Sequence, residues 1–302
     1  WKGASGLPGV VIKIIPDTET QSMMFESGEL DILDLDYAAD SADRFTETYP
    51  DQIVQGPRVG IVYFTMNFNK EPFQDVRVRK AVQMSIDRQA ILDALYGGRG
   101  QVEQGIFPHG LIGFNPDQEE IKYDPEAAKA LLAEAGYADG FDMEIAADSS
   151  ASDTMTMALE IVSDQLAEVG IRAEIKNYDE STWLETRKSG ELGSFMSTWS
   201  ADYNDPDNFI YTFFGNEEKT RIRSINYPDT EERVAKARTI VNEDERLAEY
   251  KALEEKIIHE DAAWVPMFSR LHLFAVSKRV QGFAPLWSGL SDQLFYNISL
   301  SE

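Results

Sequence analysis

The sequence predicts an α/β protein with mixed sheets, and two observations support this prediction. Short apolar, β-branched runs alternate with amphipathic helical stretches along the whole chain. The 302 residues are 43% hydrophobic and 11% aromatic, which is enough for sizeable cores and, at this length, for one or two domains. The chain contains no internal repeat and no low-complexity tract.

The chain is expected to begin with a strand–helix–strand unit. Residues 9–16 are β-branched and mostly apolar, and they predict a buried strand that ends at Pro16. A helix follows, with Asp17 or Thr18 as its cap, and residues 29–35 alternate acidic and aliphatic side chains as a second strand. Such a unit is expected to cross over right-handedly in a parallel sheet. The next expected elements are a helix over 38–49 and strands over 52–56 and 60–67.

Helix start and stop signals divide the rest of the chain. Asp75 opens a helix that is expected to run to Leu95 with a break near Asp87, and Asp124-Pro125 opens another. The inward face of a long helix over 153–169 is predicted to consist of Met157, Ile161, Leu166 and Val169. Further helices are expected at 182–188 and 228–259, and strands at 141–147, 171–175, 195–199, 262–268 and 271–276.

Composition argues against several partners and chemistries. The formal net charge of -25 argues against nucleic acid and against an anionic membrane surface as partners. The chain has no cysteine, and His109, His259 and His272 are far apart in sequence, so we expect no disulfide, no metal and no cofactor. No apolar run approaches the length of a transmembrane helix. Because the chain opens with Trp1, we expect the middle of a longer protein or a trimmed chain.

Residues 199–209 (Trp-Ser-Ala-Asp-Tyr-Asn-Asp-Pro-Asp-Asn-Phe) are the stretch most suggestive of a binding site. Pro206 lacks a backbone N–H, so the preceding strand must stop by Asp205. Trp199 and Asp202 would then stand where the strand ends. A carboxylate beside an aromatic wall suits capture of an ammonium group. The alternative is an ordinary solvated acidic turn.

Four blocks of sequence occur in an order that is typical of one family. They are Trp1 with residues 10–17 and 27–31, Asn67 with residues 72–79 and 86–88, residues 123–136, and residues 277–283 (Ser-Lys-Arg-Val-Gln-Gly-Phe). Each block alone is moderately specific, but together they span nearly the whole chain. On these residues the chain resembles the C-terminal part of an extracellular solute-binding protein of the oligopeptide, dipeptide and nickel-binding family (family 5), which serves ATP-binding-cassette importers.

The resemblance implies a two-lobed fold of the periplasmic-binding-protein type, with its N-terminal part missing here. Residues 1–66 would be part of the first lobe, 67–267 the complete second lobe, and 268–302 the return to the first lobe. The crossover strands would lie near 63–67 and 266–270. The family's extra domain and its leader segment would belong to the missing part.

The resemblance also implies site residues. Asp202 is similar to the family aspartate that binds a peptide's α-ammonium group, with Trp199 as the wall and Ser200 supplying backbone contacts. Asp205 and Asp207 are expected to shape the loop instead.

Four more residues are candidates on the same resemblance. Tyr63, Thr65 and Phe268 would face the cleft, with strand core as the alternative, since aromatic and β-branched residues favour strands regardless of function. The chain departs from some oligopeptide-binding members by having Met196 where they have an arginine. Arg187 is therefore a candidate to anchor the far end of a ligand, with an exposed helix position as the alternative.

These implications define the expected function. The protein would be a non-enzymatic receptor that captures di- or oligopeptides between two lobes and delivers them to the permease subunits of an importer. It would work in the periplasm or on the outer face of the cytoplasmic membrane, free or as a lipoprotein, and as a monomer at full length. Alternatives are an oligosaccharide, amine or metal-chelate ligand, a sensor, or a hydrolase using Asp202 and Asp205. No catalytic motif supports the hydrolase.

Overall fold

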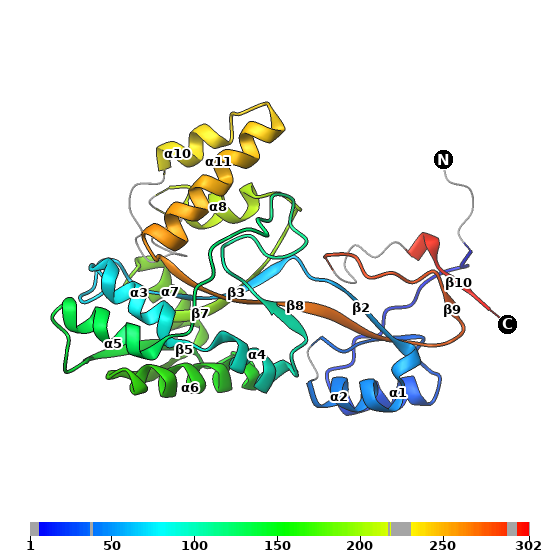
Figure 1. The fold of residues 1–302 in the computed structure, drawn as a ribbon. Helices are drawn as coiled ribbons and strands as arrows, with labels where there is room; N and C mark the ends of the chain where they lie inside the picture. Colours follow the sequence, from blue (N-terminus) through cyan, green and yellow to red (C-terminus); the bar gives the residue numbers. More distant parts are fainter. Residues whose placement is uncertain (1–5, 37–38, 217, 219–230, 289–294, 302) are drawn as a thin grey trace. The chain divides into compact units, whose positions relative to one another are not determined.

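The computed structural model describes residues 6–36, 39–216, 218, 231–288 and 295–301. The chain forms two compact units, unit 1 with residues 1–59 and 270–302 and unit 2 with residues 60–269 (Figure 1). The lobes at 1–66, 67–267 and 268–302 stay a prediction for the complete protein. In the described part of the chain, no helix is both long and apolar enough to cross a membrane.

Unit 1 is a small antiparallel sheet covered by two helices. Its strands β1 (Ile32–Asp34) and β2 (Ile53–Pro57) both pair antiparallel with the second half of β8 (Trp264–Val276). Helices α1 (Thr18–Glu26) and α2 (Ala39–Thr48) pack on it through Phe25 and Phe45, whose rings meet edge to face. The remaining elements are η1 (Pro50–Gln52), β9 (Val280–Gln281), η4 (Phe295–Asn297) and β10 (Ser299–Leu300).

The predicted strand over residues 9–16 is wrong. These residues form no strand, and their apolar side chains are exposed, with Val11 84% and Ile14 92% accessible. A strand needs a neighbour for its backbone hydrogen bonds, and in the described part of unit 1 both β1 and β2 take β8 as their partner. The predicted right-handed parallel crossover is therefore absent from this part, and the second strand shortens to β1. The α1 cap is confirmed, since Asp17 accepts a hydrogen bond from the Thr20 N–H.

Unit 2 contains an antiparallel sheet and a parallel pair of strands. In the sheet, β3 (Gly60–Thr65) lies between β7 (Phe195–Ser200) and the first half of β8, and β4 (Gly100–Val102) also pairs with β8. The parallel pair is β5 (Phe141–Asp148) and β6 (Ile171–Tyr178). This combination confirms the predicted α/β class with mixed sheets. The helices are α3 (Val76–Ser85), α4 (Arg88–Tyr96), α5 (Pro125–Glu134), α6 (Asp153–Glu168), α7 (Glu180–Ser189), α8 (Asp207–Phe214), α10 (Glu231–Ala237), α11 (Glu243–Glu255) and η2 (Lys256–Glu260).

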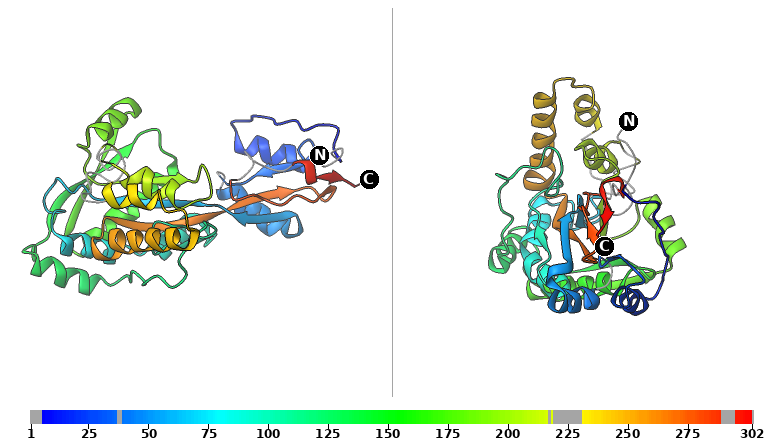
Figure 2. Two further views of the ribbon diagram at one scale, coloured as in Figure 1. Left: turned by 90° about the horizontal axis from the view of Figure 1, so that it is seen from above. Right: turned by 90° about the vertical axis from the view of Figure 1, so that its right-hand side faces the viewer.

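The two faces of β3 pack on different layers because successive side chains of a strand alternate. Val62 and Phe64 belong to the main core, which α3 to α6 cover. Tyr63 points the other way, where it stacks on Trp264 and meets Phe213 of α8 edge to face. Figures 1 and 2 show α8, α10 and α11 on one side of this sheet and α5 and α6 on the other. The candidate site follows β7, the strand at this edge of the sheet, where the chain turns into α8.

Several helix boundaries agree with the prediction. The break near Asp87 is real: α3 ends at Ser85, and the Asp87 carboxylate caps α4 by accepting from the Ala90 N–H. Likewise Asp124 caps α5 from the position before Pro125. Residues 228–230 of the predicted C-terminal helix lie outside the described residues, and the rest divides into α10, α11 and the π-helical turn η2.

Two other predictions need correction. The predicted strands at 262–268 and 271–276 are one continuous strand, β8, because Ser269 and Arg270 keep an extended backbone between them. The inward face of α6 is formed by Ala158, Leu159, Val162 and Leu166, whereas Met157 is 51% exposed. Leu166 and Val169 are buried and Ile161 packs against the core, as predicted, so Met157 is the one residue of the predicted face that points outward.

Two glycines in this unit allow a test of backbone crowding. Gly136 and Gly140 both have positive φ, but a Cβ at Gly136 would meet nothing within 4 Å. A Cβ at Gly140 would lie 1.8 Å from the Gly170 carbonyl oxygen. Gly136→Ala is expected to cost about 1 kcal/mol from the left-handed backbone alone. Gly140→Ala is expected to cost about 3 kcal/mol, since the clash adds to the strain. Urea unfolding of both variants checks this; equal costs would contradict the backbone contact.

Candidate ligand-binding site

The candidate site is the turn between β7 and α8. Within it the Asp205 N–H donates to the Tyr203 carbonyl, and the Asp205 carboxylate accepts from the Asp207 N–H at 2.8 Å. Pro206 then leads into α8 without donating a backbone hydrogen bond. These local bonds fix the path of residues 201–206, and Ser200 and Asp202 are exposed on it.

Asn208 connects the two predicted ligand residues. Its side chain, on α8, is 2% exposed. The Oδ1 atom accepts from the Trp199 indole Nε1 and from the Asp202 backbone N–H, each at 3.0 Å. The Nδ2 atom donates to Asp202 Oδ2 at 3.1 Å. One buried amide thus orients both the aromatic wall and the carboxylate, a role that the sequence analysis did not assign.

An aromatic cluster supports Trp199 from behind. The Trp199 ring meets Phe213 edge to face at a centroid distance of 5.5 Å. Phe213 in turn packs edge to face on Trp264 and on Tyr63, with centroids 4.6 and 5.2 Å away. Trp199 itself stays partly exposed at the front of this cluster. The arrangement holds one aromatic face near solvent on a rigid, water-free base.

The other two aspartates of the turn are neutralised. Arg246 of α11 forms a two-pronged ion pair with Asp205, at 2.6 and 2.9 Å. Burial opposes ionisation of Asp205, but hydrogen bonds from Arg246 and the Asp207 N–H outweigh it and lower the pKa of Asp205. Asp207 pairs with Arg238 at 3.0 Å and accepts hydrogen bonds from the hydroxyls of Tyr203 and Tyr250. Both therefore shape the loop, as predicted.

Asp202 differs from them because no ion pair reaches it among the residues that the structure describes. Its carboxylate is exposed and accepts one hydrogen bond, from Asn208. An oriented carboxylate with accessible lone pairs can accept charge-assisted hydrogen bonds from a ligand cation.

A loop after β4 supports the turn. Asn204 donates to the Gly110 carbonyl at 3.0 Å and accepts from the Ile112 N–H at 2.7 Å. The loop is anchored by two buried glutamate side chains. Glu103 accepts from the backbone and ring of His109, and Glu254 accepts from the Phe107 N–H. Glu103 therefore holds His109, whose side chain stays partly exposed.

Tyr63 and Thr65 lie on β3, next to β7, and Phe268 lies on β8, on the other side of β3; all three are buried. Tyr63 belongs to the aromatic cluster behind Trp199. The Thr65 hydroxyl donates to the Phe195 carbonyl at 3.3 Å, and Phe268 packs against Tyr96 in the main core. In this conformation they support the sheet, and direct ligand contact by any of them stays a prediction.

Arg187 lies on α7, where its guanidinium covers the rings of Trp183 and Phe195 at 4.9 and 5.1 Å. This position makes it a packing residue at the other end of β7 from Trp199, and its role as a ligand anchor stays a prediction. Trp183 is buried. The site residues that the structure brings together are thus Trp199, Ser200 and Asp202, whereas Arg187 lies at the opposite strand end.

Few signals in the sequence point to Asn208, Arg246 and Tyr250 as parts of the site. Asn208 lies in the predicted stretch, but its amide is indistinguishable in sequence from that of any turn asparagine. Arg246 and Tyr250 lie about 40 residues later, in a helix dense in charges that reads as a solvated face. Only the packing of α11 on α8 brings them to the turn.

A family model described as bacterial extracellular solute-binding proteins, family 5 Middle, matches residues 1–221. The chain is 29% identical over 306 residues to Heme-binding protein A of Haemophilus influenzae and 28% identical over 307 residues to Dipeptide-binding protein of Escherichia coli. Each match covers 99% of this chain but 55% and 56% of the relative, so the chain spans about half the length of these relatives.

Solved structures agree. HbpA2 from Haemophilus parasuis matches with a TM-score of 0.87 and 28% identity, over 100% of this chain and 60% of that one. The dipeptide binding protein from Pseudoalteromonas sp. SM9913, in complex with Met-Leu, matches with a TM-score of 0.78 and 25% identity over the same shares. The predicted periplasmic-binding-protein fold is thereby confirmed. The chain belongs to the bacterial extracellular solute-binding proteins of family 5.

Proposed function

We propose that the protein is a receptor that captures short peptides outside the cytoplasmic membrane and delivers them to the permease of an ATP-binding-cassette importer. The observation that carries the proposal is the exposed Asp202 carboxylate, oriented by Asn208 beside Trp199. Relatives named dipeptide-binding protein support the ligand class. Location in the periplasm, free or lipid-anchored, and action as a full-length monomer belong to the same proposal.

The chemistry of the turn favours binding over hydrolysis. A pair of catalytic carboxylates needs one group whose pKa is raised so that it can donate a proton. Asp205 has a lowered pKa and is committed to Arg246, so it is unsuited as the acid partner of Asp202. We therefore propose a receptor without catalytic activity.

Replacing Asp202 tests the proposal. Asp202→Ala is expected to weaken binding of a dipeptide such as Met-Leu by about ten- to a hundredfold, since a hydrogen bond to a charged group contributes roughly 1.5–3 kcal/mol. Acetylation of the peptide's amino group should cause a similar loss in the wild type and little further loss in the variant. Calorimetric titration measures both effects.

The matched control is Asp164→Ala, which removes an exposed carboxylate on α6. It should leave the affinity unchanged. If Asp202→Ala and Asp164→Ala bind Met-Leu equally well, or if acetylation has no effect, the ammonium-binding role is excluded.

A metal chelate is the second candidate ligand, favoured by the relative named Heme-binding protein A. Titration with hemin, followed by its Soret absorption, separates the two. Saturable binding of hemin that Met-Leu does not displace would favour the chelate and would leave the family assignment intact. Oligosaccharides and simple amines complete the panel.

A further inference from the structure

A second cluster of polar side chains lies apart from the turn, where the loop after β4 meets α11 and η2. Glu119 comes from the loop, and Glu255 and His259 come from the helix. One ligand atom from each of the three residues lies within 4.8 Å of the other two. Glu255 and His259 are four positions apart, a spacing that brings two side chains to the same helical face.

The groups of this cluster lack other partners among the residues that the structure describes. The His259 Nε2 atom is buried and has no hydrogen-bond partner there. Neither Glu119 nor Glu255 forms an ion pair with a described lysine, arginine or histidine. A buried ring nitrogen without a partner is costly, and so are two neighbouring carboxylates without a cation. A bound cation would neutralise the two carboxylates, and if it were ligated by Nε2 it would also give that nitrogen a partner.

Independent contacts hold the loop against the helix at this place. The Phe107 N–H donates to Glu254 at 2.7 Å. At Gly105 the approach is so close that an added Cβ would lie 2.3 Å from Glu254 Oε1 and 2.4 Å from Gln118 Oε1. Gln118 and Glu254 are the chain neighbours of Glu119 and Glu255. The loop and the helix are therefore held together by contacts other than those among Glu119, Glu255 and His259.

We propose that Glu119, Glu255 and His259 bind a divalent transition-metal ion, with Zn²⁺ as the expected occupant. One imidazole and two carboxylates form a ligand set that Zn²⁺ accepts, and three protein ligands leave a coordination position for water or a further group. Sequence spacing predicted no metal because it considered the three histidines together. The structure combines one histidine with two glutamates instead. The ion would clamp the loop that also holds Asn204 of the turn.

Zinc binding by the whole chain is the first test. Equilibrium dialysis followed by elemental analysis should find about one equivalent of Zn²⁺. His259→Gln, Glu119→Gln and Glu255→Gln should each weaken binding by at least about tenfold, as loss of groups in a metal site commonly does. Glu120→Gln and Glu260→Gln are matched controls, since both glutamates are exposed chain neighbours outside the cluster, and both should retain full affinity.

Co²⁺ supplies a readout of the ligands themselves. Its visible absorption on binding should change in His259→Gln and stay unchanged in the two controls. Thermal unfolding in the presence of a chelator shows whether each variant folds; Glu119→Gln alters an exposed loop residue and keeps the test decisive if a helix variant fails.

Three results would overturn the proposal. The first is no saturable uptake of Zn²⁺ by the wild type. The second is a loss of affinity in Glu120→Gln or Glu260→Gln equal to that in the cluster variants. The third is Ca²⁺ binding in preference to Zn²⁺ with no effect of His259→Gln, which would indicate ordinary acidic attraction without the imidazole.

Discussion

Replacing Arg88 by leucine is expected to lower the free energy of unfolding by about 3–5 kcal/mol. The Arg88 side chain is 5% exposed. Its guanidinium donates to the carbonyls of Glu103, Pro266 and Ile121 and to the side chain of Gln104, at 2.5–3.1 Å. Burial lowers the pKa of Arg88 to about 10, so the group is still charged at neutral pH. The variant would remove the side-chain donor from three buried carbonyls, whereas Gln104 Oε1 would keep the Ile121 N–H.

Arg88→Lys should recover less than half of the loss. A lysine carries its three donors on one nitrogen and cannot reach carbonyls on opposite sides as the planar guanidinium does. Urea unfolding with a common m-value gives the free energies.

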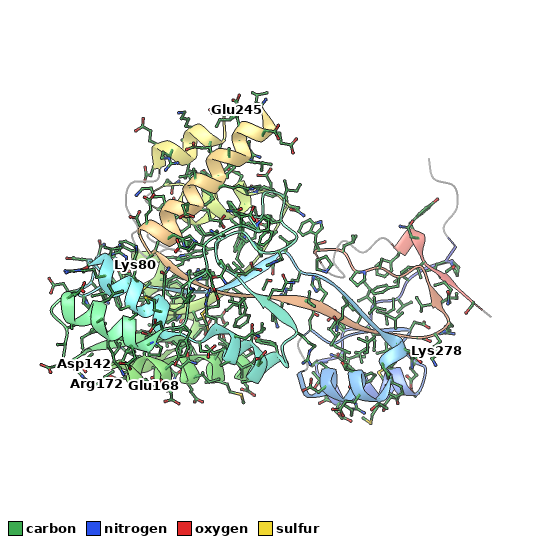
Figure 3. The ribbon with its side chains drawn as sticks, viewed as in Figure 1. Lys80, Asp142, Glu168, Arg172, Glu245 and Lys278 are labelled. Carbon is green, nitrogen blue, oxygen red and sulfur yellow. The ribbon has the colours of Figure 1, made fainter. Side chains whose placement is uncertain are left out.

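The matched control is Arg172→Ala. Arg172 and Asp142 form an exposed ion pair across β5 and β6, where Figure 3 shows the two side by side. Its loss should cost less than about 1 kcal/mol. An Arg88→Leu cost as small as this would show that the buried hydrogen bonds contribute little.

Replacing Asn208 by alanine is expected to weaken dipeptide binding by about a hundredfold, at least as much as loss of Asp202. The variant removes the hydrogen bonds to Trp199 and to the backbone and carboxylate of Asp202. A ligand would then have to order both side chains when it binds, and that conformational entropy lowers the affinity.

A double-mutant cycle distinguishes positioning from simple loss of stability. If Asn208 acts through Asp202, the binding free energy of the double variant should lie within about 0.5 kcal/mol of that of the weaker-binding single variant. Calorimetry on protein shown to be folded supplies the four affinities. Additive losses would mean that Asn208 acts independently of Asp202, and unchanged affinity in Asn208→Ala would refute its positioning role.

Local signals in the sequence predicted much of the fold. Asp17, Asp75 and Asp124 begin helices where they were expected to, because a cap needs only its own side chain and the N–H groups of the next turn. The strand before residue 200 was predicted as well, since a buried apolar run that ends near a proline has few other solutions.

Elements that depend on distant partners were predicted less well. Residues 9–15 have strand composition, yet a strand exists only where a neighbouring strand completes its hydrogen bonds. On α6, Met157 was predicted to face inward but is exposed, because Met157 and Ala158 are both apolar and only the packed core decides which of the two it buries. The burial of Tyr63 could not be predicted either. A tyrosine suits a binding site as well as a core, and only the packing of Phe213 and Trp264 against the sheet buries it.

The sequence by itself determined the family, the class of fold and the position of the turn that holds Trp199 and Asp202, because these follow from contiguous residues. Only the tertiary structure decided how that turn is held. Asn208 contacts residues six and nine positions earlier, Arg246 reaches Asp205 across 41 positions, and Glu119 approaches His259 from another part of the chain. Side chains from different helices and loops meet only after these elements have packed. A sequence pattern does not show which of them become neighbours.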